Sequence, residues 1–400
     1  AYFFSLLCGY YILRPVRDAM GIAGGVQQLQ WLFTGTFVAM LAAVPLYGWV
    51  TARFPRRRFL PYVYYFFIAN LLLFYALFEA GDPGAKVARA FFIWASVYNL
   101  FVVSVFWSFM ADLYSNPQAR RLFGFIAAGG TAGALTGPML TAVLAVPLGT
   151  NTLLLVSAAF LAIAVVCIHR LVAWRERVPA APSASAESAE RPLGGGVLAG
   201  IRLVVRSPYL LGICLLMLLF TTLSTFLYFQ QAQIVRDSFA SSAERTAVFA
   251  AIDLAVNTLT ILIQVLLTAR IVQWLGVGGT LAMIPLLLAG GFVALGFAPV
   301  LATLIVVQVL RRAGEYAITR PAREMLYVVL AREEKYKAKN FIDTVVYRGG
   351  DAVSAWAYAG LRALGLGLGA IAFIAVPLAL AWAWVAFIIG RRQEALAARP

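Results

Sequence analysis

The chain has 400 residues, of which 62% are hydrophobic and 12% are charged. A soluble domain is nearer half apolar and one quarter charged, so a disordered chain and a coiled coil are excluded and a soluble enzyme is not expected. One membrane span needs about 20 apolar residues, and the chain has enough for about twelve. The net charge of +15 is typical of basic cytoplasmic loops in a membrane protein, so we expect no nucleic-acid partner.

Twelve apolar runs follow one another along the chain, six on each side of a polar break. The first six lie at about 1–22, 29–51, 59–80, 88–113, 122–147 and 150–173. The second six lie at about 208–234, 246–272, 277–298, 300–330, 339–364 and 366–390. The sequence therefore predicts an all-α membrane protein with two six-helix pseudo-repeats, 1–173 and 208–400.

The break at 174–207 has the composition of a flexible linker. Pro179 to Pro192 is rich in alanine, serine and proline, and three glycines follow at 194–196. Residues 197–206 are expected to form a short interfacial helix with Arg202 and Arg206 on one face.

Basic residues predict the orientation in the membrane. With the N-terminus inside, the cytoplasmic loops and ends hold 20 Lys and Arg residues and the opposite side holds 5. Cytoplasmic loops carry the excess of Lys and Arg, so both termini and the linker are expected in the cytoplasm. We expect the protein in the cell membrane of a bacterium, its inner membrane.

Chemistry-bearing motifs are sparse. Cys8, Cys167, Cys214 and His169 are far apart in the sequence, so we expect neither disulfides nor a metal site, and His169 is expected at the membrane interface. No phosphate-binding loop motif is present. The chain is not expected to be an enzyme or to bind a cofactor.

The first span contains charged residues at membrane depth. Arg14 and Arg17 are three residues apart and share a helix face, with Pro15 between them and Asp18 after them. Such groups cost several kcal/mol unless they are paired or face water. Either the span ends near residue 13 and these charges are interfacial, or it continues to about Gly21 and the arginines face a cavity.

The predicted span at 300–330 holds six charged residues around Pro321: Arg311, Arg312, Glu315, Arg320, Arg323 and Glu324. Arg311 with Glu315, and Arg320 with Glu324, have the spacing of ion pairs. Arg312 and Arg323 are then left unmatched in their helix. A structural charge network near the cytoplasmic end is the alternative.

Four acidic residues complete the set of charges in the predicted spans. In the span at 339–364, Asp351 is placed to pair with Arg348, which leaves Asp343 as a candidate site residue or as the partner of a cation in the preceding span. Asp112 ends the fourth span, near the expected cytoplasmic mouth, and Asp253 lies in the eighth.

The seventh span offers an aromatic and amide edge. The ring of Tyr228 can stack on a ring of the solute, and the amides of Gln230 and Gln231 can donate hydrogen bonds to it. Ordinary polarity at a helix end is the alternative. If the three residues face the cavity, they are expected to affect which substrates compete.

Arginine exceeds acid among these candidates. Guanidinium groups bind carboxylate and phosphate oxygens through two parallel hydrogen bonds, so the sequence predicts an anionic substrate. Arg17 in the first half and Arg323 in the second, neither with an obvious full partner in its own helix, are expected to clamp it.

The six-plus-six plan resembles the major facilitator superfamily. The segment 48–58 is similar to that superfamily's loop between spans two and three, although Ala52 and Pro55 replace the usual acid and glycine. A glycine-proline pattern similar to that of its exchangers is formed by Gly124, Gly133, Gly137 and Pro138. Close helix packing is predicted from Gly129, Gly133 and Gly137.

Three segments also resemble the ATP/ADP antiporter family of plastids and intracellular bacteria. They are 11–18, 106–112, and 320–330 followed by 337–343. The family carries lysine at the positions of Arg17 and Arg323, glutamate at Asp112 and an acid at Asp343. It has a further glutamate in the seventh span, where this chain has Tyr228 and glutamines.

This resemblance implies a secondary transporter that moves an anionic, phosphorylated, nucleotide-like solute by alternating access, as an exchanger. We expect a monomer surrounded by membrane lipids. One alternative is a proton-coupled exporter of drugs or lipids with Asp112 or Asp343 as the proton carrier. Another is a non-transporting membrane receptor or assembly partner.

Overall fold

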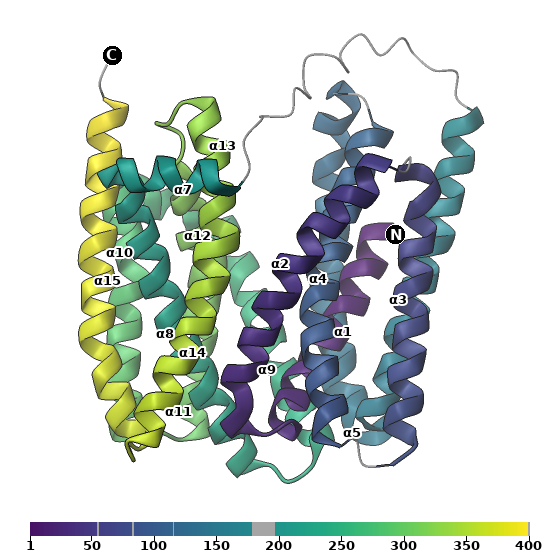
Figure 1. Cartoon of the computed structure of the whole chain (residues 1–400), viewed down its shortest axis with the longest axis horizontal. Coiled ribbons are helices and arrows are strands. Elements are labelled where there is room, and N and C mark those ends of the chain that lie inside the picture. Colours follow the sequence, from purple (N-terminus) through teal and green to yellow (C-terminus); the bar gives the residue numbers. More distant parts are fainter. Residues whose placement is uncertain (54–55, 82–83, 115, 178–196, 399–400) are drawn as a thin grey trace. The chain divides into compact units, whose positions relative to one another are not determined.

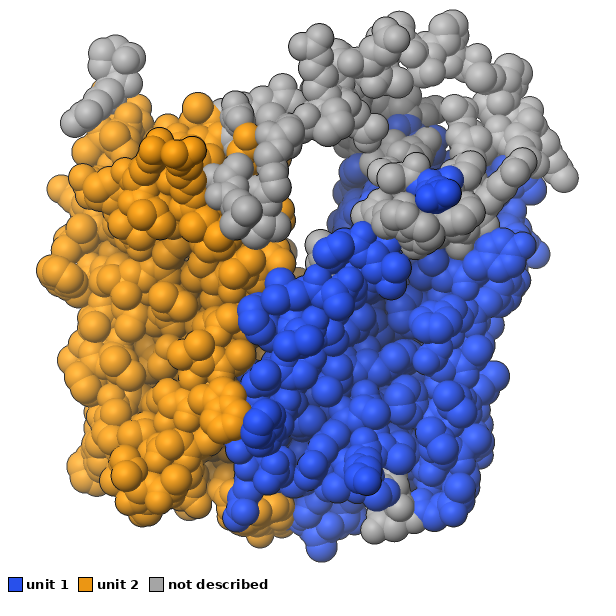
Figure 2. Space-filling model, viewed as in Figure 1, with its two compact units in different colours: residues 1–191, 239–254 blue, residues 192–238, 255–400 orange. Residues whose placement is uncertain are grey.

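The computed structural model describes residues 1–400 except 54–55, 82–83, 115, 178–196 and 399–400. The described part is built from helices and contains no strand (Figure 1), as the sequence predicts. It divides into two compact units, one of residues 1–191 and 239–254 and the other of residues 192–238 and 255–400 (Figure 2). Each unit is described by itself below.

Unit 1 contains the first five long helices of the chain. They are α1 (Tyr2–Ala23), α2 (Leu29–Arg53), α3 (Arg56–Glu79), α4 (Ala85–Leu113) and α5 (Asn116–Arg177), with a short 3-10 helix, η1 (Val26–Gln28), before α2. The predicted spans at 122–147 and 150–173 are both in α5, which is kinked where Gly149 has φ 78°. A positive φ is a glycine conformation, and this kink is the turn that the sequence places between two spans.

The packing of α1 on α5 depends on glycine. A Cβ atom added to Gly137 would lie 2.7 Å from the carbonyl oxygen of Cys8, and one added to Gly133 would be closer still to the main chain of Phe4. Two helices approach this closely only where small residues line the contact. The expected glycine ridge is therefore confirmed at Gly133 and Gly137.

Aromatic side chains form the core of unit 1. Tyr2 of α1 donates a hydrogen bond to the hydroxyl of Tyr64 on α3 at 2.7 Å, and its ring lies edge-on to Phe106 of α4. The ring of Phe3 stacks on the ring of Phe106, with the ring centroids 4.1 Å apart. These contacts hold α1 between α3 and α4.

Unit 2 is formed by the later helices. They are α7 (Val197–Arg206), α8 (Pro208–Ser238), α10 (Thr268–Phe297), α11 (Leu301–Gly314), α12 (Arg320–Met325), α13 (Arg332–Phe341), α14 (Tyr347–Ala363) and α15 (Leu368–Ala397). Two π-helical turns, η2 (Glu315–Thr319) and η3 (Ile342–Val346), join α11 to α12 and α13 to α14. Helix α9 (Ser242–Leu266) belongs to unit 1 up to Leu254 and to unit 2 from Ala255.

The short helix predicted at 197–206 is present as α7. It packs against α8 and α13 and runs crosswise to the long helices of unit 2 (Figure 1). The linker residues 178–196 are outside the described residues.

Seven described helices are long and apolar enough to cross a membrane. One of them, the stretch Arg121–Trp174 of α5, has 54 residues and is long enough for two spans. Helix α1 has 22 residues but falls outside this set because Arg14, Arg17 and Asp18 lie within it. The spans expected at 300–330 and 339–364 are each interrupted by a π-helical turn.

Candidate functional site

Two of the predicted arginines, Arg14 and Arg17, lie in the second half of helix α1. The helix continues past Pro15 to Ala23, so both arginines lie within a continuous helix. The Nε atom of Arg14 lies 3.6 Å from the carboxylate of Asp253, whose side chain is only 3% exposed. Asp253, left without a role by the sequence, is therefore the ion-pair partner of Arg14 in unit 1.

Arg17 also lies beside a carboxylate. Its Nε and Nη2 atoms both donate to one oxygen of Asp18, at 3.0 and 2.7 Å, and its guanidinium lies 5.2 Å from the ring centre of Phe92 on α4. The expectation that Arg17 lacks a partner in its own helix is wrong.

Unit 2 concentrates positive charge in its interior. Among its described residues, four charged residues are buried: Arg311, Arg312, Glu315 and Arg323. They belong to one continuous stretch of chain, α11 followed by η2 and α12. Three arginines against one glutamate leave a surplus of positive charge among these four residues.

The ion pairs of this stretch differ from those that its spacing predicts. Glu315 lies 3.9 Å from Arg323, not against Arg311, and Glu324 pairs with Lys339 of α13 at 2.5 Å. The observed pair Glu315–Arg323 spans the π-helical turn at Glu315–Thr319, whose hydrogen bonds run from i to i+5, so α-helical spacing does not predict it. Glu324 pairs with a lysine of another helix, which the spacing within its own helix cannot indicate.

Arg311 is held by a polar chain that includes the seventh span. Its Nε atom donates to Gln308 at 3.1 Å and its Nη1 atom donates to Ser224 of α8 at 3.0 Å. The amide of Gln308 in turn donates to Gln231 of α8. Gln231 thus supports an arginine through Gln308, a role that the sequence does not indicate.

The other candidates of the seventh span have different surroundings. Gln230 is fully buried and donates to the carbonyl oxygen of Leu368 at 3.2 Å. Tyr228 is half-buried. Both lie on α8, and Gln230 Oε1 accepts no hydrogen bond within the described part of the chain.

The acids of the eleventh span behave in part as predicted. Arg348 and Asp351 form the expected ion pair, at 3.6 Å, and Asp351 also accepts a hydrogen bond from Thr225 of α8 at 3.5 Å. Asp343 is half-buried on η3, and the positive charges that act on it most strongly are those of Arg323 and Lys339. The side chain of Asp112, at the end of α4, is outside the described residues, as is the loop around 54–55.

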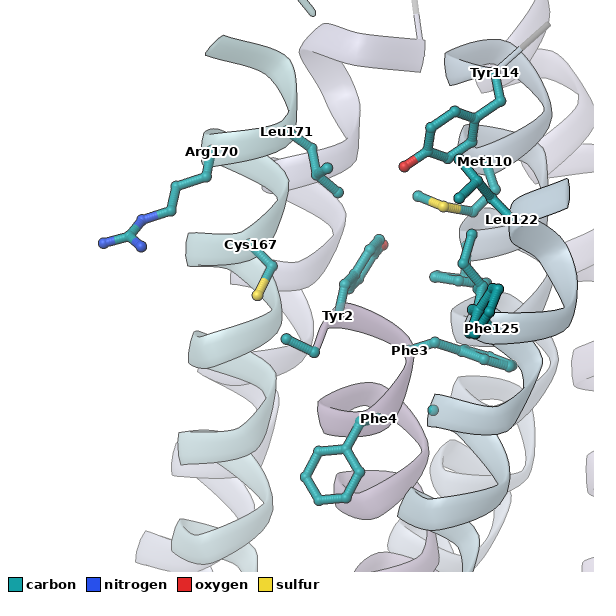
Figure 3. A pocket seen from close by; sticks show the side chains of 14 residues that line it. Tyr2, Phe3, Phe4, Met110, Tyr114, Leu122, Phe125, Cys167, Arg170 and Leu171 are labelled. Carbon is teal, nitrogen blue, oxygen red and sulfur yellow. The ribbon is translucent and has the colours of Figure 1, made fainter. Parts of the chain in front are cut away.

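Unit 1 contains a cavity with a mainly apolar lining, in contrast to the charged interior of unit 2. It has a volume of about 480 Å³ and is lined by aromatic and aliphatic side chains from the start of α1, the end of α4 and both ends of α5 (Figure 3). Arg170 borders it, but its guanidinium points away (Figure 3). This cavity suits an apolar group and does not suit an anion.

Several contacts around the arginines could not be found from the sequence. Ser224 and Met217 reach them from α8, so only tertiary structure brings these residues together, whereas Gln308 lies one turn before Arg311 on the same helix. The three cysteines are free, and His169 is exposed with its Nε2 atom 3.2 Å from the hydroxyl of Tyr65.

Comparison with known proteins assigns the family. The model of the Major Facilitator Superfamily matches residues 2–319, and the chain belongs to this superfamily. Comparison with curated proteins gives no match.

Solved structures have the same fold at low identity. The nucleoside transporter NupG is 14% identical, with 100% of this chain and 98% of that chain covered and a TM-score of 0.63. A bacterial homolog of the human lysosomal transporter Spinster is 16% identical, with 100% and 98% covered and a TM-score of 0.60. The POT family transporter PepTSo is 14% identical, with 98% and 97% covered and a TM-score of 0.65.

The predicted fold is therefore confirmed, and the protein is a membrane-embedded, multi-pass secondary transporter. Identities of this size define the fold and leave the solute to be argued from the site.

Proposed function

We propose that the chain transports an anionic, phosphorylated, nucleotide-like solute by alternating access and works as an exchanger. The observation that carries this proposal is the group of Arg311, Arg312 and Arg323 in the interior of unit 2, with Glu315 as the one acid among the charged side chains buried there in the described chain. A buried charge is costly unless it is paired. An anionic solute would add negative charge beside these arginines.

Arginine is suited to this solute by its shape as well as its charge. Its planar fork donates two parallel hydrogen bonds to a phosphate group, which a lysine cannot do. Arg323 can donate further hydrogen bonds, because its Nε atom donates none within the described chain. Its Nη1 atom contacts the sulfur of Met217 at 3.4 Å. Arg323 is therefore the residue that we propose for the phosphate contact.

Arg17 is proposed as the second phosphate contact during the transport cycle. The ion pair with Asp18 would then orient its guanidinium as well as neutralise it. The remaining proposed contacts are Arg14, Asp112, Tyr228, Gln230, Gln231, Arg312 and Asp343. Of these, Gln231 would act by holding Arg311 through Gln308.

The proposed setting is the inner membrane of a bacterium, with a monomer surrounded by lipid and both termini in the cytoplasm. The domain plan that goes with it is the one predicted from the sequence, two bundles at 1–173 and 208–400 joined by a cytoplasmic linker. The excess of basic residues in one set of loops supports this orientation.

The test is uptake and exchange in proteoliposomes with labelled ADP, ATP, AMP and inorganic phosphate. Uridine is the neutral comparison, because it has the ring and ribose of a nucleotide without its phosphate. We expect the phosphorylated compounds to compete with one another and uridine to compete weakly. Uptake of uridine alone, or of none of these compounds, would contradict the proposal.

Variants of the two arginines refine this test. Arg17→Lys and Arg323→Lys keep the charge but lose the fork, so partial transport is expected. Arg17→Gln and Arg323→Gln lose the charge as well, and binding of the anion should be lost. If both glutamine variants bind the anion with unchanged affinity, these arginines have a structural role only.

The aromatic cavity of unit 1 favours a second candidate function, export of an apolar compound. Tyr2, Phe3 and Phe125 line it, and such a surface binds drugs or lipids without a charge contact. In that case an apolar dye, and not ADP, should compete for transport, and Phe125→Ala should weaken that competition.

A further inference from the structure

Glu315 and Arg323 form an ion pair without a hydrogen bond. The Oε1 atom of Glu315 lies 3.9 Å from the Nη1 atom of Arg323, beyond the 2.7–3.2 Å that is typical of a hydrogen bond. The two side chains are only 9% and 10% exposed. Glu315 Oε2 and Arg323 Nε have no hydrogen-bond partner within the described chain. Each group is thus held in place by charge, and each has a polar atom that a ligand or a proton can satisfy.

The surroundings of Glu315 are predominantly cationic. Besides Arg323, the positive charges that act on it are those of Arg311 and Arg320, and the hydroxyl of Tyr347 on α14 lies within electrostatic range. Arg312 is adjacent to Arg311 in sequence and is likewise buried, and Asp343 faces Arg323 from η3. Helix α10, which packs against η2, presents Ile284 to the preceding turn.

From this arrangement we infer that Glu315 couples anion binding to proton uptake. The solute anion and the carboxylate of Glu315 compete for the guanidinium of Arg323. When the anion binds Arg323, Glu315 loses its nearest counter-ion while the anion adds negative charge beside it, so the carboxylate takes a proton from water. The inference rests on the proposed function, because it names the ion that travels with the anion.

The proton balance of this step is simple. The empty site contains ionised Glu315 paired with Arg323, and the loaded site contains the anion paired with Arg323 and neutral Glu315. No bond is broken apart from the transfer of one proton from the solvent to the carboxylate. When the anion leaves, Glu315 returns its proton and pairs with Arg323 again, so anion and proton move together.

The sign of the pH dependence follows from this balance. A lower pH favours the neutral carboxyl group and frees Arg323, so anion affinity should increase as the pH falls. Uptake of one proton for each anion makes Kd change by about tenfold for each pH unit between the pKa values of the empty and loaded states. Glu315→Gln removes the competitor, so it should bind the anion tightly without this dependence.

The experiment uses the purified full chain in detergent with ADP as the probe. Proton uptake on adding ADP is followed with a pH-sensitive dye in weakly buffered solution, and Kd is measured across pH. Glu324→Gln is the matched control, because Glu324 lies in the same stretch, pairs with Lys339 and is half exposed. We expect proton uptake in the wild type and in Glu324→Gln, and none in Glu315→Gln.

A spectroscopic measurement on the wild type gives an independent reading. Difference infrared spectra should show a carboxylic acid C=O band that appears when ADP binds, that shifts when the protein is made with ¹³C-labelled glutamate, and that is absent from Glu315→Gln. This arm holds even if Glu315→Gln folds poorly. Binding of ADP to the wild type without proton uptake or without this band would overturn the inference, as would loss of ADP binding in a folded Glu315→Gln variant.

A ligand-free arm separates the inference from the proposed function. Arg323→Gln removes the counter-ion permanently, so its spectrum should show the protonated carboxyl band without ADP. The band should vanish in the double variant Arg323→Gln/Glu315→Gln. If the wild type binds none of the phosphorylated compounds, the proposed function fails. If Arg323→Gln lacks the band, the coupling by Glu315 fails.

Discussion

Each buried acid in the described part of unit 1 lies beside an arginine of α1. Asp18 is paired with Arg17 and Asp253 is paired with Arg14. Removing one member of a buried pair leaves the other charge without its counter-ion, which costs more than removing both. The stability of α1 against its neighbours therefore depends on matched charges and not on apolar contact alone.

The pair of Arg14 and Asp253 gives a direct test at this scale. Arg14→Gln should lower the free energy of unfolding by about 3 kcal/mol, because Asp253 is left charged in the interior. The double variant Arg14→Gln/Asp253→Asn should recover most of this loss. The measurement is thermal unfolding in detergent, and equal losses that simply add in the double variant would show that the two residues do not interact.

The amide chain from Gln231 to Arg311 leads to a prediction about substrate choice. Gln231→Ala leaves Gln308 without its acceptor, so Arg311 should lose part of its fixed orientation. We expect the order in which ADP, AMP and phosphate compete for uptake to change while the folded fraction stays the same. Gln233→Ala is the control on the same helix, since Gln233 bonds only to Asp237 four residues on, and a like change there would contradict this role.

At the scale of the helix, the contact of α1 with α5 sets the position of both arginines of α1. A Cβ atom on Gly137 would lie 2.7 Å from the Cys8 oxygen and 2.8 Å from Tyr11 Cβ. Gly137→Ala should therefore destabilise the protein by about 1–3 kcal/mol, the usual cost of overpacking. Gly124→Ala, where nothing lies within 4 Å, should cause no loss. Equal thermal unfolding of the two variants would show that α1 can move away from α5.

The sequence predicts regular helices well and departures from the α-helix poorly. The apolar runs predict where the helices lie, but they leave the extent of α1 past Pro15 open, because charged residues follow that proline. The pairing of Glu315 with Arg323 does not follow, because nothing in local spacing marks the π-helical turn. Likewise, Asp253 and Gln308 acquire their partners from helices distant in sequence, so their roles could only be read from tertiary structure.

At the scale of the whole chain, composition alone predicts much of the result. A 62% apolar chain with a polar break in its middle predicts a two-part helical membrane protein, and the superfamily match confirms the fold. The solute is less determined, since the same fold occurs in structures named for nucleosides and for the POT family. The solute must therefore be argued from the buried charges of this chain.

The surplus of buried arginine in unit 2 also makes the membrane voltage relevant. Moving one elementary charge across 100 mV changes the free energy by about 2.3 kcal/mol, and the empty unit carries three buried arginines against one buried glutamate in its described part. If this group crosses part of the electric field during the cycle, voltage acts on its charge together with that of the bound solute. In an exchanger both crossings are loaded, so the charge of the arginines cancels over one cycle and the difference between the two solutes remains. Recordings on solid-supported membranes should then show a current when ADP is exchanged for ATP, and none when ADP is exchanged for ADP. The electrical gradient would thus act on exchange between unlike solutes and leave exchange between like solutes unaffected.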